Sequence, residues 1–298
     1  MIALHPEAHA PSVHEVLGWW TWDVLVIPVL VIAATTYAIG LGRLWRNAGQ
    51  GHGIDRLDAA AYAGGIAAFA LALLSPLDRA SDVLFSAHMA QHELLMLVAA
   101  PLVVLGRPFV PMLWSMPQPW RAKALRAVRR PAALRVWRFL TAPVVALVLH
   151  GLVRWIWHLP AAFEAALADE RVHIVQHVTF FASAALFWWS LVHGKYRRAG
   201  YGIAVVFVFF TAMHSGLLAA LLSLSDTPWY GSHALRTNAW GLDPVEDQQR
   251  AGLLMWIPGG VLLTSIGLAF LAAWLGAAGR RVAHSSHQGL VGSSEVPP

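Results

Sequence analysis

The sequence predicts an all-α polytopic membrane protein, built as a bundle of seven transmembrane helices. Of its 298 residues, 57% are hydrophobic and only 12% are charged, a composition that soluble globular domains do not have. Runs of roughly 17 to 25 apolar residues are long enough to cross a bilayer core of about 30 Å. Seven such runs are present, namely Val24–Leu41, Leu57–Leu74, Val83–Leu105, Leu140–Trp157, Val172–Val192, Gly202–Leu222 and Leu253–Leu275.

The charged residues predict the orientation of this bundle. Most of the 21 Lys and Arg residues fall after the first, third, fifth and seventh runs, whereas most of the 16 acidic residues fall in the opposite connections. Because cytoplasmic loops are enriched in Lys and Arg, we expect the N-terminus outside and the C-terminus in the cytoplasm. This distribution accounts for the net charge of +5, so membrane lipids are expected as partners and nucleic acid is not.

One bundle explains the chain, and no internal boundary divides it. We expect residues 1–23 to form an outer N-terminal segment, residues 24–275 to form the seven-helix transmembrane domain, and residues 276–298 to form a disordered cytoplasmic tail rich in Ser and Gly. The first 22 residues contain no Lys or Arg and no apolar h-region. A cleavable signal peptide is therefore not expected.

Two histidine pairs with the same spacing are the main candidates for a metal site. His88 and His92 lie near the start of the third apolar run, and His173 and His177 lie near the start of the fifth. Residues at i and i+4 share one face of a helix. Both imidazoles of each pair can therefore reach one ion.

The predicted orientation places the histidines in one layer of the bundle. At a rise of 1.5 Å per residue, both pairs lie roughly 2 to 13 Å below the outer boundary of the membrane. His158 is expected at the outer end of the fourth run and His214 about 12 Å below the outer end of the sixth, and we expect both to complete the ligand shell. Residues from four helices thus converge in the outer half, where buried polar side chains are costly and usually functional.

The residue types in this layer favour copper over zinc. The chain has no cysteine, so a metal site must use His, Met and carboxylate groups. Imidazole with thioether suits copper, Cu(I) especially, whereas imidazole with carboxylate and water suits zinc. Met89 and Met255 are the candidate thioether ligands, while Glu93 and Asp247 keep zinc as the alternative.

Six further polar residues are expected to support the ligands rather than to bind the ion. They are Gln91, Glu93, His150, Arg154, Gln176 and Asp247. Arg154 is a cation within a span, and we expect it to pair with an acid such as Glu93. A lone intramembrane histidine such as His150 or His214 is equally compatible with a helix-to-helix hydrogen bond.

In combination, several motifs resemble the CtaG family of caa-type cytochrome c oxidase assembly factors. The matching stretches are Ser75–Leu77, Ser86–His92, Ala100–Pro108, Trp155–Pro160, His173 and His177 with Phe187–Trp189, and Asp247–Pro258. The resemblance implies a multi-pass protein of the bacterial inner (plasma) membrane, not an enzyme, that handles copper on the outer side while the oxidase is built. Its implied partners are a cytochrome c oxidase subunit and a copper donor chaperone. The positions that match family motifs are His88, His92, His158, His173, His177 and Met255.

Three other functions are compatible with these residues. An intramembrane hydrolase would hold zinc with three histidines and use Glu93 as a base. A haem-binding membrane electron carrier would use His150 and His214, on different helices at similar depth, as axial ligands. A structural scaffold would bind oxidase subunits without any metal.

Overall fold

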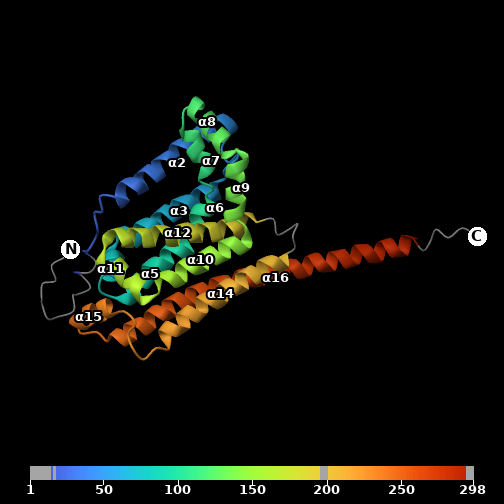
Figure 1. Cartoon of the computed structure of the whole chain (residues 1–298). Coiled ribbons are helices and arrows are strands. Elements are labelled where there is room, and N and C mark those ends of the chain that lie inside the picture. The colour runs from blue at the N-terminus through green and yellow to red at the C-terminus, as the bar shows by residue number, and fades with distance from the viewer. Residues whose placement is uncertain (1–14, 16–17, 195–200, 293–298) are drawn as a thin grey trace, which may run out of the picture.

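The computed structural model of the protein describes residues 15, 18–194 and 201–292, with side chains described as far as residue 278. Within these ranges the chain forms helices joined by turns and has no β-strand, which confirms the all-α class (Figure 1). The elements are α2 (Val26–Ala48), α3 (Arg56–Leu74), α4 (Pro76–Ser81), α5 (Phe85–Glu93), η1 (Leu94–Ala99), α6 (Ala100–Leu105), α7 (Phe109–Ser115), α8 (Gln118–Val128), α9 (Pro131–Leu140), α10 (Pro143–Trp157), α11 (Pro160–Ala168), α12 (Glu170–His193), α14 (Tyr201–Ser223), α15 (Gly231–Ala239) and α16 (Pro244–Gly292).

Six helical segments in the described part of the chain are long and apolar enough to cross a membrane. They are α2, α3, the continuous run from α5 to α6, α12, α14, and α16 as far as Ala278. α9 and α10 add a seventh if they form one span, which is bent by 62°. Pro143 stands in the first turn of α10, where its missing N–H removes no helical hydrogen bond. The chain is therefore a multi-pass helical protein with six or seven candidate spans.

The span that contains the first histidine pair is interrupted by a turn of π-helix. This turn, η1, separates α5 from α6, and Pro101 follows it in the first turn of α6. Proline has no N–H, so the carbonyl that precedes it by five residues, that of Met96, needs another donor. The indole Nε1 of Trp188 on α12 donates to this oxygen at 2.8 Å. The packing of α12 on this span therefore includes a specific hydrogen bond.

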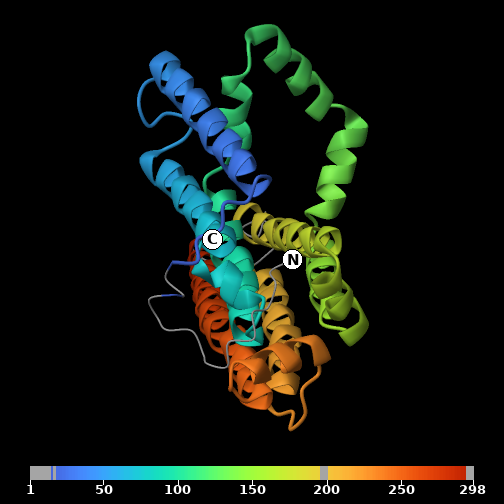
Figure 2. The ribbon, with the colours of Figure 1, turned by 90° about the vertical axis from the view of Figure 1, so that its left-hand side faces the viewer.

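The connections that contain α4, α11 and α15 meet at one end of the bundle. The charge distribution in the sequence predicts that all three lie on the same side of the membrane. α11 and α15 lie together at this end, at the left of Figure 1. Arg236 of α15 donates from Nη1 to the carbonyl of Asp82, just after α4, at 2.8 Å, and the backbone N–H of Ser232 donates to Glu164 of α11 at 3.1 Å. Figure 2 shows α7, α8 and α9, which contain most of the basic connection, arching between α2 and α10.

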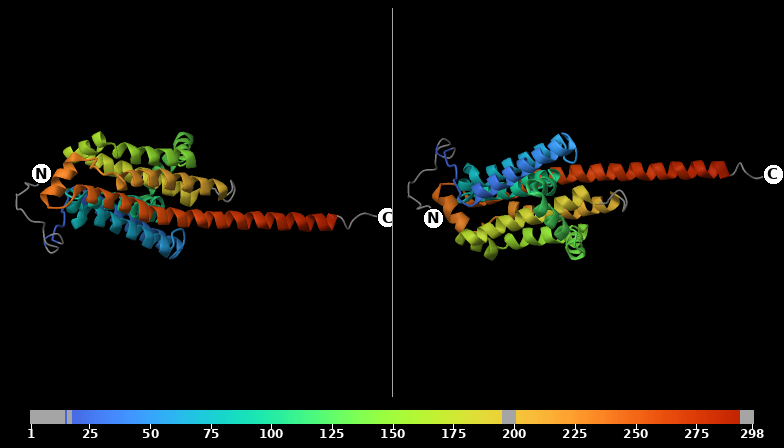
Figure 3. Two further views of the ribbon diagram at one scale, coloured as in Figure 1. Left: turned by 90° about the horizontal axis from the view of Figure 1, so that it is seen from below. Right: turned by 90° about the horizontal axis from the view of Figure 1, so that it is seen from above.

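α14 and α16 lie side by side over much of their length (Figures 1 and 3). α16 continues to Gly292, beyond residue 276, where the predicted disordered tail begins. No proline occurs between residue 276 and Gly292, so no residue in this stretch removes a backbone hydrogen bond from the helix. The end of the predicted tail, 293–298, lies outside the described residues, as do residues 1–14 and 16–17 of the predicted outer segment.

Candidate metal centre

The two histidine pairs face each other between α5 and α12. Within each helix, the ring centroids of His88 and His92 are 4.3 Å apart, and those of His173 and His177 are also 4.3 Å apart. Between the helices, His88 lies 5.5 Å from His173, and His92 lies 5.1 Å from His177. One potential ligand atom from each of His88, His92 and His173 falls within 4.8 Å of the others. We call His88, His92, His173 and His177 the four-His cluster.

Most imidazole nitrogens of this cluster are buried without hydrogen-bond partners among the described residues. Both ring nitrogens of His88 and of His92, and Nε2 of His173 and of His177, have no partner among the described residues. His88 and His92 are each only 1% exposed. Leaving a buried polar atom unpaired costs roughly 1–3 kcal/mol. A neutral imidazole has one lone pair, so a cation could accept one from each ring and lower this cost; the chemistry of the donor set therefore fits a metal ion.

Asp247 holds the helix on which His88 and His92 lie. Its carboxylate accepts from the backbone N–H of Phe85 at 2.6 Å and from that of Ser86 at 3.4 Å, and it also accepts from the Ser86 hydroxyl. Leu84, the N-cap residue of α5, makes no side-chain cap. The cap of α5 thus comes from α16, and it fixes the start of the helix one turn before His88.

Gln91 connects α5 to α3 and α4 rather than to a histidine. Its Nε2 donates to the Ala72 carbonyl and to Oδ1 of Asp78, both at 2.9 Å. Asp78 also accepts from the Thr21 hydroxyl at 3.0 Å. Burial raises the pKa of Asp78, although these two hydrogen bonds act in the opposite direction. Gln176 is also buried, and its Oε1 has no partner among the described residues.

Arg154 forms the buried ion pair with Glu93 that the sequence predicted. The Arg154 guanidinium and the Glu93 carboxylate are in direct contact, with side chains 3% and 8% exposed. The guanidinium also approaches the Met96 sulfur, at 4.0 Å. One carboxylate oxygen of Glu93, Oε1, is therefore engaged by a buried cation, while Oε2 has no partner among the described residues.

His158 and Met89 form a second pair of soft donors. Nδ1 of His158 lies 2.6 Å from the Arg154 carbonyl, which assigns the proton to Nδ1, and Nε2 faces the Met89 sulfur at 3.4 Å. A nitrogen and a sulfur bound to one tetrahedral ion, at about 2.0 and 2.3 Å, would themselves be about 3.5 Å apart. The rings of His158 and His92 both lie against Phe180, at 6.2 and 4.6 Å. This pair therefore lies beside the four-His cluster.

His150 and His214 lie next to each other and apart from the four-His cluster. Their ring centroids are 6.5 Å apart, and Nδ1 of His150 lies 3.3 Å from the Ser183 hydroxyl. His150 lines a cavity of about 170 Å³, together with Arg154 and Met255 among others. The structure thus does not bring His214 to the predicted site. Met255 packs in the apolar cluster that also contains Met89.

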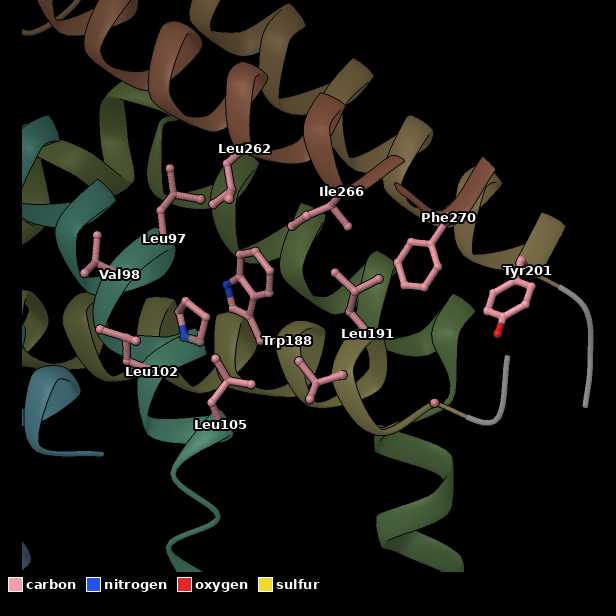
Figure 4. A pocket seen from close by; sticks show the side chains of 13 residues that line it. Leu97, Val98, Leu102, Leu105, Trp188, Leu191, Tyr201, Leu262, Ile266 and Phe270 are labelled. Carbon is pink, nitrogen blue, oxygen red and sulfur yellow. The ribbon is translucent and has the colours of Figure 1, made fainter. Parts of the chain in front are cut away.

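A larger cavity of about 710 Å³ lies beside the π-helical turn, away from the histidines. Figure 4 shows that its lining is apolar, with Leu97, Trp188, Ile266 and Phe270 directed toward it. None of the predicted ligands lines this cavity.

His233 of α15 is a candidate ligand that sequence reasoning missed. It is 2% exposed, and its ring lies 5.6 Å from that of His88. Burial lowers its pKa to about 4, so the imidazole is neutral at pH 7. The only signal in the sequence is a single histidine in a long outer connection, because its approach to His88 depends on how α15 folds back over the bundle.

Comparison with known proteins identifies the relatives of the chain. Two uncharacterized proteins, one from Mycobacterium bovis and one from Mycobacterium tuberculosis, are each 26% identical over 259 residues. These alignments include 83% of this chain, and the chain spans 38% of the length of each relative. No solved structure matches the chain.

A match to a known protein family includes every span that contributes to the four-His cluster. Residues 35–277 match the family described as cytochrome c oxidase caa3 assembly factor (Caa3_CtaG). This segment runs from α2 to the first part of α16 and contains α5, α12 and α15. The chain belongs to the cytochrome c oxidase caa3 assembly factor family.

Proposed function

We propose that this protein binds copper in the four-His cluster and delivers it to a cytochrome c oxidase subunit during assembly of the oxidase. The observation that supports this most directly is the set of buried imidazole nitrogens without partners, contributed by two helices at matching positions. Copper is the cargo of the protein in this proposal, and His88, His92, His173 and His177 are the residues that hold it.

The residues around the cluster support copper rather than zinc. Imidazole and thioether donors together suit Cu(I), and Met89, whose sulfur contacts His158 Nε2 at 3.4 Å, is the residue that follows His88 in the chain. Zinc sites more often add a carboxylate or a thiolate. The chain has no cysteine, and the nearby carboxylate of Glu93 is paired with Arg154.

The position of the cluster supports exchange of the ion at the outer face of the bacterial inner membrane. His88 lies in the first turn of α5, directly after the connection that contacts α15. In the proposed orientation, with the N-terminus outside, this end of the bundle faces the periplasm or cell exterior. A copper donor chaperone and the oxidase subunit would then dock at this end, while lipids surround the spans.

The alternative functions find less support in the geometry. A zinc hydrolase needs a base that faces the ion, whereas Oε1 of Glu93 contacts the buried Arg154. A haem carrier needs a macrocycle between His150 and His214, but the cavity beside His150 measures about 170 Å³, below the range of roughly 300–1,000 Å³ usual for small-molecule sites. A scaffold without metal gives no role to the unpaired imidazoles.

The experiment that tests this function is complementation of a bacterial strain lacking the gene. We expect the wild-type gene to restore oxidase activity and the copper content of the purified oxidase, and His88→Ala combined with His173→Ala to restore neither. His214→Ala, which removes a half-buried imidazole outside the cluster whose ring nitrogens also lack partners among the described residues, is the control and should restore both. Full restoration by the double variant, at equal protein level in the membrane, would overturn the proposal.

A further inference from the structure

α15 is tied to the bundle end by hydrogen bonds on both sides of His233. The Thr237 hydroxyl donates to the Val83 carbonyl at 2.9 Å, and Arg236 donates to the adjacent Asp82 carbonyl at 2.8 Å. At the start of the helix, the backbone N–H and hydroxyl of Ser232 donate to Glu164 of α11. These contacts hold the middle of α15 over the N-terminal turn of α5.

The two nitrogens of His233 have different environments. Nδ1 lies 3.3 Å from the carbonyl of Val83, an oxygen that can only accept, so the ring proton is assigned to Nδ1. Nε2 then has a free lone pair, and it is buried with no partner among the described residues. An imidazole whose outer N–H is held by a backbone carbonyl, with its other nitrogen free, has the usual arrangement of a metal-binding histidine.

The rings in contact with His233 are two phenyl rings and one imidazole. The ring lies against Phe85 and Phe163, at 5.8 and 5.6 Å, and against His88 at 5.6 Å. Neither phenyl ring can donate a hydrogen bond to Nε2. The remaining neighbour, His88, itself has two unpaired ring nitrogens.

We propose that His233 is a further ligand of the ion held by the four-His cluster, contributed by α15 from outside the two helices that bear the cluster. This inference rests on the proposed function, since it requires that the cluster bind an ion. It makes occupancy of the site depend on the position of α15: a docked α15 adds a donor and covers the cluster. Displacement of α15 by a partner at this end would remove one ligand and favour release.

The test is Cu(I) binding by the full-length protein in detergent, measured by competition with a chromophoric Cu(I) chelator. We expect His233→Gln to weaken Cu(I) binding tenfold or more, and His214→Ala to leave it unchanged. In this chain without cysteine, His233→Cys should restore binding and add one sulfur ligand to the copper shell. X-ray absorption reads this sulfur directly, which a purely structural role of His233 would not produce.

The outcomes separate this inference from the function on which it rests. If wild-type protein binds Cu(I) and His233→Gln binds it equally well, His233 is not a ligand and the four-His cluster stands alone. An unchanged copper shell in His233→Cys would also exclude His233 as a ligand, even if His233→Gln fails to fold. If wild-type protein itself binds no Cu(I), the proposed function is wrong.

Discussion

At the scale of single residues, the unpaired imidazole nitrogens determine the proposed function. Nearly all buried polar atoms in proteins have a hydrogen-bond partner, yet both ring nitrogens of His88 and of His92 have none among the described residues. Each unpaired atom costs roughly 1–3 kcal/mol in the folded protein. A bound cation would accept one lone pair from each neutral imidazole and recover part of this free energy, so the protein should be more stable with its ion than without it.

The buried ion pair of Glu93 and Arg154 gives the first prediction about a residue. We expect Glu93→Gln to lower the free energy of unfolding by about 3 kcal/mol, because the Arg154 charge would remain buried without a counter-charge. Replacing both partners, Glu93→Gln with Arg154→Met, should recover most of this loss. Thermal unfolding of the purified protein in detergent measures both values. Wild-type stability in the single variant would show that the pair does not hold the helices together.

At the scale of elements, the start of α5 depends on a side chain from another helix. Asp247 of α16 supplies the cap of α5, so its removal should affect the helix on which His88 and His92 lie. We expect Asp247→Ala to cost about 1 kcal/mol of stability. We also expect weaker Cu(I) binding, because the turn before His88 loses its fixed position. Unfolding and Cu(I) competition experiments measure the two effects.

Asp243 offers a matched control for this prediction. Its Oδ1 accepts from the backbone N–H of Val245 at 2.8 Å, so it caps α16 itself. Asp243→Ala should therefore cost a similar amount of stability while leaving Cu(I) affinity unchanged. An equal loss of affinity in Asp243→Ala and Asp247→Ala would mean that the cap of α5 has no particular role in placing the histidines.

The packing of the helices also shows which parts of the site could be predicted from the sequence. Spacing of four residues places two histidines on one helix face, and similar depth in two spans was enough to predict that the pairs meet. Depth does not determine which face of a helix turns inward, so His214 lies toward His150 rather than toward the cluster. His233 could not be predicted, because its place results from the packing of α15 on three other segments. The π-helical turn before Pro101 depends likewise on the indole of Trp188.

At the scale of the whole molecule, the ends of the bundle differ in charge and in structure. The acidic connections come together around α11 and α15, beside the four-His cluster, while the basic connection forms α7, α8 and α9 (Figures 1 and 2). With the N-terminus outside, the cluster would lie near the end that faces the periplasm or exterior and be separated from the cytoplasm by the bundle.

Single cysteines test this orientation cleanly, because the natural chain has none. Asp226 and Arg126 are exposed positions in the connections predicted to lie outside and inside. In intact cells, we expect a membrane-impermeant maleimide to label Asp226→Cys and not Arg126→Cys. Permeabilised cells should label both. The reverse pattern in intact cells would place the four-His cluster on the cytoplasmic side and exclude delivery at the outer face.

The copper content of the purified protein tests the central claim most directly. After loading with Cu(I) and removal of free metal, we expect wild-type protein and the His214→Ala control to retain copper in a fixed ratio to protein. His88→Ala combined with His173→Ala, which removes one imidazole from each helix of the four-His cluster, should retain almost none. Equal copper in the double variant and the wild type would contradict the assignment of the four-His cluster as the copper site.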